Sequence, residues 1–117
     1  MKELDLFYLQ QEEPAKSCFL VLREHILNYN KNITETWKFR MPFFCCKGQS
    51  FCYFRINRKD GMPYVGFTEG KRMSHQALVS SDRVRIKILM VVPSEDLPAE
   101  VLDGILKEAI YLCETSL

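Results

Sequence analysis

Two stretches in the middle of the chain alternate between apolar and polar side chains, and this alternation constrains the fold most strongly. In 36–41, which runs Thr-Trp-Lys-Phe-Arg-Met, aromatic and apolar side chains take every second position. In 50–56, Cys52, Phe54 and Ile56 share one side of a strand with the same period. A period of two residues is typical of strands whose two faces meet different surroundings. The pattern therefore predicts a sheet that is covered on one face and open on the other.

The remaining strands and turns follow from weaker local signals. Connections of hairpin length between strands imply antiparallel pairing. Gly66 lies inside a predicted strand, where a glycine indicates a bulge or a close backbone approach. The further strands are predicted at Phe43–Cys46, Tyr64–Thr68 and Asp82–Val92, with turns at Lys47–Gln49 and at Asp60 and Gly61.

Helices are predicted before, within and after these strands. The second helix is expected to begin at Pro14, because proline suits the first helical position, and to end near Asn28–Asn32. Ser94 can cap the closing helix, and Pro98 offers a second start for it. The predicted helices are Leu4–Gln10, the segment after Pro14 with apolar residues at helical spacing, Met73–Leu78, and a closing helix with the stripe Val101, Leu102, Ile105, Ala109, Leu112 and Cys113.

The order α-β-β-β-β-α-β-α predicts a two-layer α+β fold. We expect a mostly antiparallel sheet of about five strands with the helices packed on one face. The 117 residues fit a single domain, 1–117, that can bury a core without disulfides or a structural metal.

The charge balance excludes some partners. The chain has 16 basic and 15 acidic residues, so its net charge is +1. Such a chain has no global field that attracts nucleic acid or a membrane, and we expect neither as a partner. The N-terminal segment lacks the apolar core of a signal peptide, and no apolar run approaches the length of a membrane span. We therefore expect a cytoplasmic protein.

No cofactor, metal or catalytic site is predicted. The five cysteines lack the paired C-x-x-C spacing of zinc sites, and we expect free, mostly buried thiols on two helices and three strand positions. His25 and His75 fall in different predicted helices, and no serine lies in G-x-S-x-G. We therefore expect a protein that is not an enzyme. An enzyme would need a histidine and a cysteine that only the fold could bring together.

The open sheet face is the candidate functional surface. The alternation places basic and aromatic side chains on the face that helices do not cover, where they suit an anionic or planar ligand. The helices are expected over the opposite face, which holds Trp37, Phe39, Phe54, Ile56, Val84, Ile86 and Ile88. The candidate ligand-binding residues are Trp37, Lys38, Arg40, Tyr53, Tyr64, Arg85 and Lys87.

Two other interpretations of this surface stay open. Basic side chains on an exposed sheet face also keep a sheet soluble and prevent edge pairing, without any ligand. If Phe43, Phe44 and Phe51 do not all fit under the helices, the exposed remainder would favour a homodimer. The partners that the sequence allows are thus a small anionic ligand, a protein segment or a second copy of the chain.

Four motifs resemble one known family. They are W-K-F-R-M-P-F-F at Trp37–Phe44, K-G-Q-S-F-C-Y-F at Lys47–Phe54, P-Y-V-G-F-T-E-G at Pro63–Gly70 and R-V-R-I-K at Arg83–Lys87. Together they resemble the YdhG-like family, small bacterial domains of unknown function. The resemblance spans almost the whole chain, and it implies a two-layer fold similar to type III secretion chaperones.

The resemblance also implies an alternative function. Some members of that family are described as frataxin-like iron chaperones, which would bind iron through surface carboxylates. In this chain the iron ligands would have to be Glu95, Asp96, Glu100 and the N-terminal acids. The leading expectation remains a binding domain that uses its open sheet face.

Overall fold

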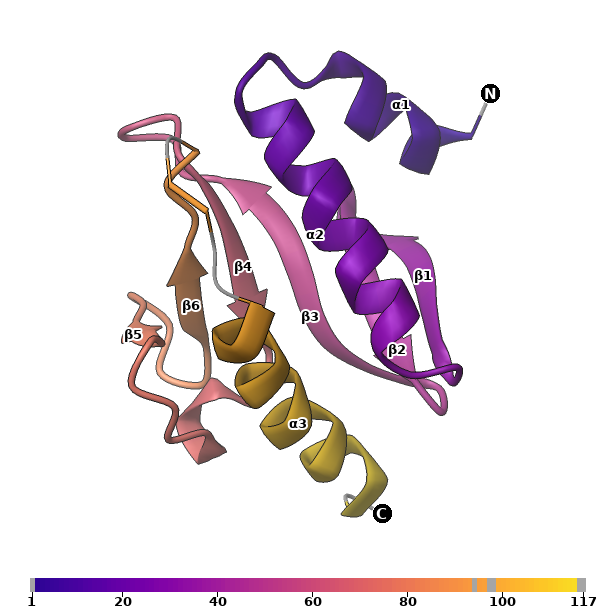
Figure 1. Ribbon diagram of the computed structural model, residues 1–117, viewed down its shortest axis with the longest axis vertical. Coiled ribbons are helices and arrows are strands. Elements are labelled where there is room, and N and C mark those ends of the chain that lie inside the picture. The colour runs from indigo at the N-terminus through magenta and orange to yellow at the C-terminus, as the bar shows by residue number, and fades with distance from the viewer. Residues whose placement is uncertain (1, 94, 97–98, 116–117) are drawn as a thin grey trace.

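The computed structural model describes residues 2–93, 95–96 and 99–115. In Figure 1 the helices α2 and α3 lie side by side across one face of a curved sheet, and α1 lies beyond one end of α2. Ser94 and Pro98, the predicted starts of the last helix, lie outside the described residues. The elements are α1 (Glu3–Gln10), α2 (Ala15–Tyr29), β1 (Ile33–Lys38), β2 (Met41–Cys46), β3 (Gln49–Ile56), β4 (Pro63–Phe67), the 3₁₀ helix η1 (Gly70–Arg72), β5 (Val79–Ser80), β6 (Lys87–Met90) and α3 (Ala99–Thr115).

The predicted α+β class is confirmed. The described strands form one six-stranded sheet in the order β1-β2-β3-β4-β6-β5, and every neighbouring pair is antiparallel. The first four strands form a meander in chain order, as hairpin-length connections require. The short edge strand β5 raises the strand number above the predicted five.

The segment between β4 and β6 differs from the prediction. No helix forms over Met73–Leu78, because the backbone N–H groups of Ser74 and His75 donate to the Glu108 carboxylate on α3, at 2.9 and 3.1 Å. The predicted strand Asp82–Val92 is also too long, since Ser81 Oγ donates to the Ile86 carbonyl at 2.7 Å. That bond closes a loop over 81–86, and β6 begins only after it.

The covered face is held together by aromatic rings around Phe54. This side chain is fully buried, and its ring centroid lies 5.0 Å from Phe19 of α2, 4.9 Å from Phe44 of β2 and 6.4 Å from Tyr8 of α1. Burial of a side chain of this size contributes about 1.5–3 kcal/mol through removal of apolar surface from water. One residue of β3 thus joins both N-terminal helices to the middle of the sheet.

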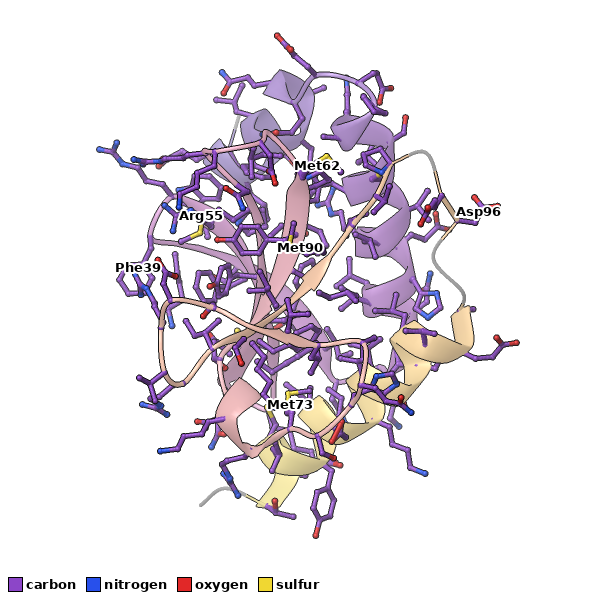
Figure 2. All side chains as sticks on the ribbon, turned by 90° about the vertical axis from the view of Figure 1, so that its left-hand side faces the viewer. Phe39, Arg55, Met62, Met73, Met90 and Asp96 are labelled. Carbon is purple, nitrogen blue, oxygen red and sulfur yellow. The ribbon has the colours of Figure 1, made fainter. Side chains whose placement is uncertain are left out.

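The two faces of the sheet carry different side chains. Figure 2 shows Phe39 and Arg55 on the sheet side of the molecule and Asp96 at the opposite edge, near the helices. Tyr53 and Arg55 project from the face of β3 opposite Phe54, as the alternation predicts. The predicted side-chain phase is therefore right for β3.

The predicted phase is wrong for β6. Leu89 is buried in the core at 3% exposure, whereas Ile88 and Met90 lie half-buried on the other face and Val84 is 82% exposed in the loop. Residues 88–91 are all apolar, so alternation within them cannot tell which parity faces the helices. The loop at 81–86 fixes the phase instead.

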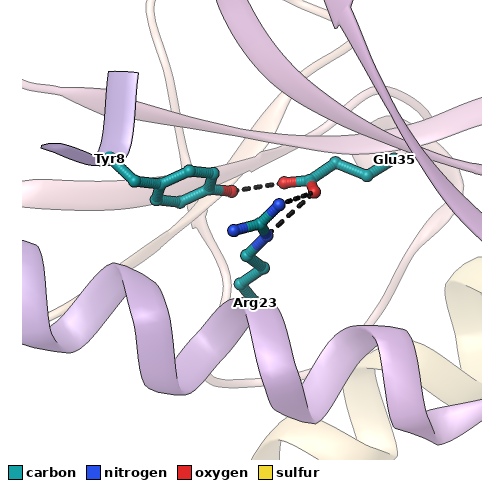
Figure 3. A network of polar contacts seen from close by, with 3 residues as sticks. All are labelled: Tyr8, Arg23 and Glu35. Carbon is teal, nitrogen blue, oxygen red and sulfur yellow. Dashed lines mark hydrogen bonds and ion pairs between the residues drawn. The ribbon is translucent and has the colours of Figure 1, made fainter. Parts of the chain in front are cut away.

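A charged network is enclosed between the helices and β1. Figure 3 shows this network: Tyr8 Oη donates to Glu35 Oε2 at 2.5 Å, Arg23 Nε donates to Glu35 Oε1 at 2.8 Å, and Arg23 Nη2 forms an ion pair with the same oxygen at 2.8 Å. The Arg23 guanidinium also lies 4.4 Å from the centre of the Tyr8 ring. The Glu35 side chain is only 7% exposed, so Tyr8 and Arg23 supply the contacts that water would otherwise make. The network fixes α1 and α2 against β1.

The buried phenol of Tyr8 makes the stability of the fold dependent on alkaline pH. Burial, and then the Glu35 carboxylate, raise the pKa of Tyr8 far above its ordinary value of 10.0. Above pH 10 the unfolded chain loses this proton and the folded chain keeps it, so stability falls by up to about 1.4 kcal/mol per pH unit. Urea denaturation from about pH 8 to about pH 11 should show a steeper decline for the natural protein than for Tyr8→Phe. Equal slopes would contradict the buried hydrogen bond.

Candidate functional site

A groove of about 860 Å³ opens at the uncovered side of the sheet, and four arginines line it. Arg40 comes from the β1–β2 turn, Arg55 and Arg58 from the end of β3 and the residues after it, and Arg83 from the 81–86 loop. A second hollow of about 460 Å³ adjoins it and shares the last three of these arginines. We call the combined site the arginine groove. Its cations come from segments far apart in the sequence, which the sheet brings together.

The four groove arginines have no anionic partner within the described part of the chain. The described residues form four ion pairs, Arg23–Glu35, His25–Asp103, Lys47–Glu114 and Arg85–Glu69, and none includes a groove arginine. Asp82 is the single acidic residue among those lining the two hollows, and it forms no ion pair there. A guanidinium group carries its charge at all ordinary pH values, so the groove holds an excess of positive charge.

Aromatic rings form the floor of the arginine groove. Tyr53 stacks on Phe43 with ring centroids 5.1 Å apart and lies 6.5 Å from Tyr64 on the next strand. Both Phe43 and Tyr53 are more than nine-tenths buried, so the floor is rigid. Gly66 faces Tyr53, and a Cβ at that position would overlap the tyrosine ring. The group that approaches Gly66 closely is thus a side chain, and the β3–β4 pairing continues past it without a shift of register.

Burial also affects the ionisation of Tyr53 in the groove floor. Burial raises the pKa of the Tyr53 phenol, and Tyr64 raises it further, while Arg83 and Arg55 lower it. The phenol of Tyr53 therefore stays protonated at neutral pH and remains a hydrogen-bond donor. Lys38 adds a cation beside the floor, because its Nζ donates to Ser50 Oγ at 3.3 Å and lies 5.5 Å from the centre of the Phe43 ring.

The turn that carries Arg40 has an unusual backbone. Phe39 and Arg40 form the two-residue β1–β2 turn with φ values of 51° and 62°. The β2–β3 turn has the same φ pattern, but Gly48 occupies its second position at φ 82°. Asparagine and glycine favour this left-handed turn, whereas residues with a larger side chain incur a steric cost. The β1–β2 turn therefore keeps two unfavourable residues beside the groove.

Four of the seven predicted ligand-binding residues gather at this surface. Arg40 and Tyr53 line the larger hollow, Tyr64 lines the smaller one, and Lys38 lies beside Phe43. Trp37 does not belong there: its Nε1 donates to Glu3 of α1 at 3.1 Å, and its ring lies 6.1 Å from Phe7. It faces the helices, as the alternation of β1 requires.

Arg85 and Lys87 do not share the open face, and this part of the prediction is wrong. Arg85 lies in the 81–86 loop, where its guanidinium pairs with Glu69 at 2.9 Å. Lys87 has the parity of buried Leu89, and its Nζ donates to the Met73 carbonyl at 2.7 Å. The error for Arg85 follows from the loop over 81–86, and the error for Lys87 follows from the reversed phase of β6.

Three groove arginines were not among the predicted site residues. Arg55 has the correct parity on β3, beside Tyr53, and that signal was already in the sequence. Arg58 and Arg83 lie outside the regular strands, where alternation carries no information. Phe39 and Ile86 were both predicted on the covered face. Phe39 instead lies in a turn and is 78% exposed, and Ile86 lines the groove.

The three phenylalanines that suggested a dimer are buried within one chain. Phe43, Phe44 and Phe51 are 6%, 0% and 3% exposed. Phe43 stacks on Tyr53 and lies against Phe39, and the other two belong to the buried core cluster. They therefore give no reason to expect a second copy of the chain.

The cysteines and histidines form no metal-binding cluster in the described ranges. All five cysteines are free thiols, and burial raises the pKa of Cys46, Cys52 and Cys113, the last to about 11. Within residues 2–93, 95–96 and 99–115, no group of three or more His, Cys, Asp or Glu side chains could hold a metal ion. His25 instead contacts Asp103 at 2.6 Å, and His75 Nδ1 accepts from the Ala77 N–H at 3.1 Å.

Comparisons with known proteins add no relative. No family model, no curated protein and no solved structure matches this chain. None of the helices in the described ranges is long and apolar enough to cross a membrane. The site must therefore be interpreted from its own geometry.

The two hairpin turns provide a test of the strain beside the groove. Arg40→Gly should raise the free energy of unfolding by about 0.5–1 kcal/mol, because the left-handed backbone costs a non-glycine residue about 1–2 kcal/mol and glycine loses part of this gain in chain entropy. Gly48→Ala is the matched reverse change and should lower stability by about 1 kcal/mol. Urea denaturation measures both. A destabilising Arg40→Gly would show that contacts of Arg40 outweigh the turn strain.

Proposed function

We propose that this chain is a non-enzymatic binding domain that holds a small anionic ligand in the arginine groove. The observation that carries the proposal is the convergence of Arg40, Arg55, Arg58 and Arg83 on one groove, with no ion pair to any described residue. Elsewhere on the described surface, Arg23 and Arg85 do pair with carboxylates. The groove arginines therefore differ from Arg23 and Arg85, which each have a carboxylate partner.

Guanidinium chemistry selects the ligand class. Each guanidinium offers several N–H donors in a planar fork that matches the oxygens of a carboxylate or phosphate. A hydrogen bond to a charged group contributes about 1.5–3 kcal/mol, roughly twice a neutral one. Several guanidinium groups around one groove favour a ligand with more than one negative charge, since a single charge would leave cations without a partner.

The groove suits a small molecule in size and rigidity. Its larger hollow of about 860 Å³ lies within the range of about 300–1,000 Å³ typical of small-molecule sites. The floor is part of the sheet and is anchored by the Tyr53–Phe43 stack. A preformed site loses little entropy when it binds, so the arginines can act without rearrangement of the fold.

The family assignment and the cellular location also belong to the proposal. The motif at Trp37–Phe44 and the two-layer fold are consistent with a YdhG-like domain. We further propose a cytoplasmic protein, because five free thiols suit a reducing compartment.

No observation favours iron binding over anion binding. Asp96, one of the candidate carboxylates, lies at the edge of the molecule opposite Phe39 and Arg55 in Figure 2. The described residues include no metal-binding cluster of the kind that a hard cation requires.

A protein segment is a further possible ligand of the groove. Such a segment would need negative charges to match the four arginines.

Calorimetric titration with inorganic tripolyphosphate tests the proposed anion site. We expect saturable binding that weakens as salt is added, since ions screen exposed charges. Arg55→Gln and Arg83→Gln should each weaken binding about tenfold, which corresponds to about 1.4 kcal/mol. Both changes lie outside the buried core, so thermal unfolding should show intact folds.

Arg85→Gln is the matched control, because it removes the same charge from the same loop outside the groove. It should leave the dissociation constant for tripolyphosphate unchanged. Equal loss in Arg83→Gln and Arg85→Gln would reduce the effect to net charge and exclude a specific site. Absence of binding at millimolar tripolyphosphate would end the proposal.

A further inference from the structure

We propose that the ligand of the arginine groove is a nucleotide, a planar aromatic base that carries phosphates, and that the base stacks on Phe39. This inference rests on the proposed anion-binding function and adds the part of the ligand that the arginines do not recognise. It is carried by the conformation and exposure of Phe39, which the anion site alone does not explain.

Neither turn propensity nor packing accounts for Phe39. Its φ of 51° lies in the left-handed region, where asparagine and glycine are favoured and an aromatic residue is not. The side chain is 78% exposed, so it buries little apolar surface in return. Strained residues that bring no packing benefit are concentrated at ligand-binding sites.

The position of Phe39 suits a stacking role at the rim of the groove. Its ring centroid lies 6.0 Å from Phe43 of the groove floor at an interplanar angle of 62°, and Lys38 Nζ lies 6.0 Å from its ring. Figure 2 shows Phe39 projecting from the same side of the molecule as Arg55. Phe43 and Tyr53 are already stacked and buried, and Phe7 and Tyr64 are half-buried, so Phe39 is the most exposed of the aromatic rings that line the groove.

Ring and cations together define a two-part ligand. A planar base can stack on Phe39 while its phosphates reach the neighbouring guanidinium groups, which bind phosphate oxygens in pairs. Loss of one base–aromatic stack typically costs about 5- to 150-fold in affinity. The groove of about 860 Å³ is large enough for both parts.

The charge distribution favours a free nucleotide over a nucleic-acid strand. Proteins that hold a strand align cations along an extended track, and their affinity arises from many phosphate contacts. Here the net charge is +1, and the unpaired arginines converge on one groove instead of following a track. A compact polyphosphate can meet them simultaneously.

Titration calorimetry with matched ligands separates the base from the phosphates. The probes are ATP, GTP, CTP and UTP, each compared with inorganic tripolyphosphate at equal pH and salt. We expect at least one nucleoside triphosphate to bind the natural protein about tenfold or more tightly than tripolyphosphate, because only the nucleotides can stack. Decathymidylate serves as the strand probe and should bind more weakly than that nucleotide.

Two variants assign the preference to Phe39. Phe39→Asn should abolish the nucleotide preference, keep the affinity for tripolyphosphate and raise Tm, because asparagine tolerates the left-handed turn. Phe39→Tyr keeps a ring and should retain the preference. A purely structural role for Phe39 would instead predict that Asn lowers Tm and both affinities together.

The outcomes distinguish the two proposals. Equal affinity for tripolyphosphate and every nucleotide would overturn the stacking inference and leave the anion site intact. Tighter binding of decathymidylate would overturn the free nucleotide as the ligand. If no polyphosphate binds at all, the anion-binding function itself fails, and this inference fails with it.

Discussion

Phe54, fully buried between the sheet and the helices, is the packing centre of the N-terminal half of the fold. Its ring contacts Phe19, Phe44 and Tyr8, so one position of β3 holds two helices and a neighbouring strand in place. Because side chains alternate along a strand, the inward direction of Phe54 forces Tyr53 and Arg55 to the opposite face. The packing of the core therefore places Tyr53 and Arg55 in the arginine groove.

Charged side chains have different surroundings on the covered and the open face of the sheet. On the covered side, Glu35 accepts hydrogen bonds from Tyr8 and Arg23 and forms an ion pair with Arg23, so its charge is matched within the fold. On the open side, the groove arginines lie beside a rigid aromatic floor with no such match among the described residues. The strained β1–β2 turn adds an exposed ring at the same place. A fold that gives up stability in this way is consistent with selection for binding.

The sequence predicts what alternation and turn chemistry control, and little beyond them. The meander and the buried face of β3 both follow from local patterns. The phase of β6 does not, because residues 88–91 are apolar at both parities and a side-chain bond from Ser81 decides where the strand begins. Arg58 and Arg83 reach the groove from loops, whose course depends on tertiary contacts that periodicity does not record.

Nuclear magnetic resonance of the arginine side chains can show which guanidinium groups meet a bound anion. The Nε–Hε signals report each guanidinium separately while tripolyphosphate is added to the natural protein. We expect the signals of the four groove arginines to shift together and saturate with one dissociation constant, whereas those of Arg23 and Arg85, already paired with carboxylates, stay in place. Shifts of Arg85 as large as those of Arg55 and Arg83, or no saturation, would contradict a specific anion site on the open face.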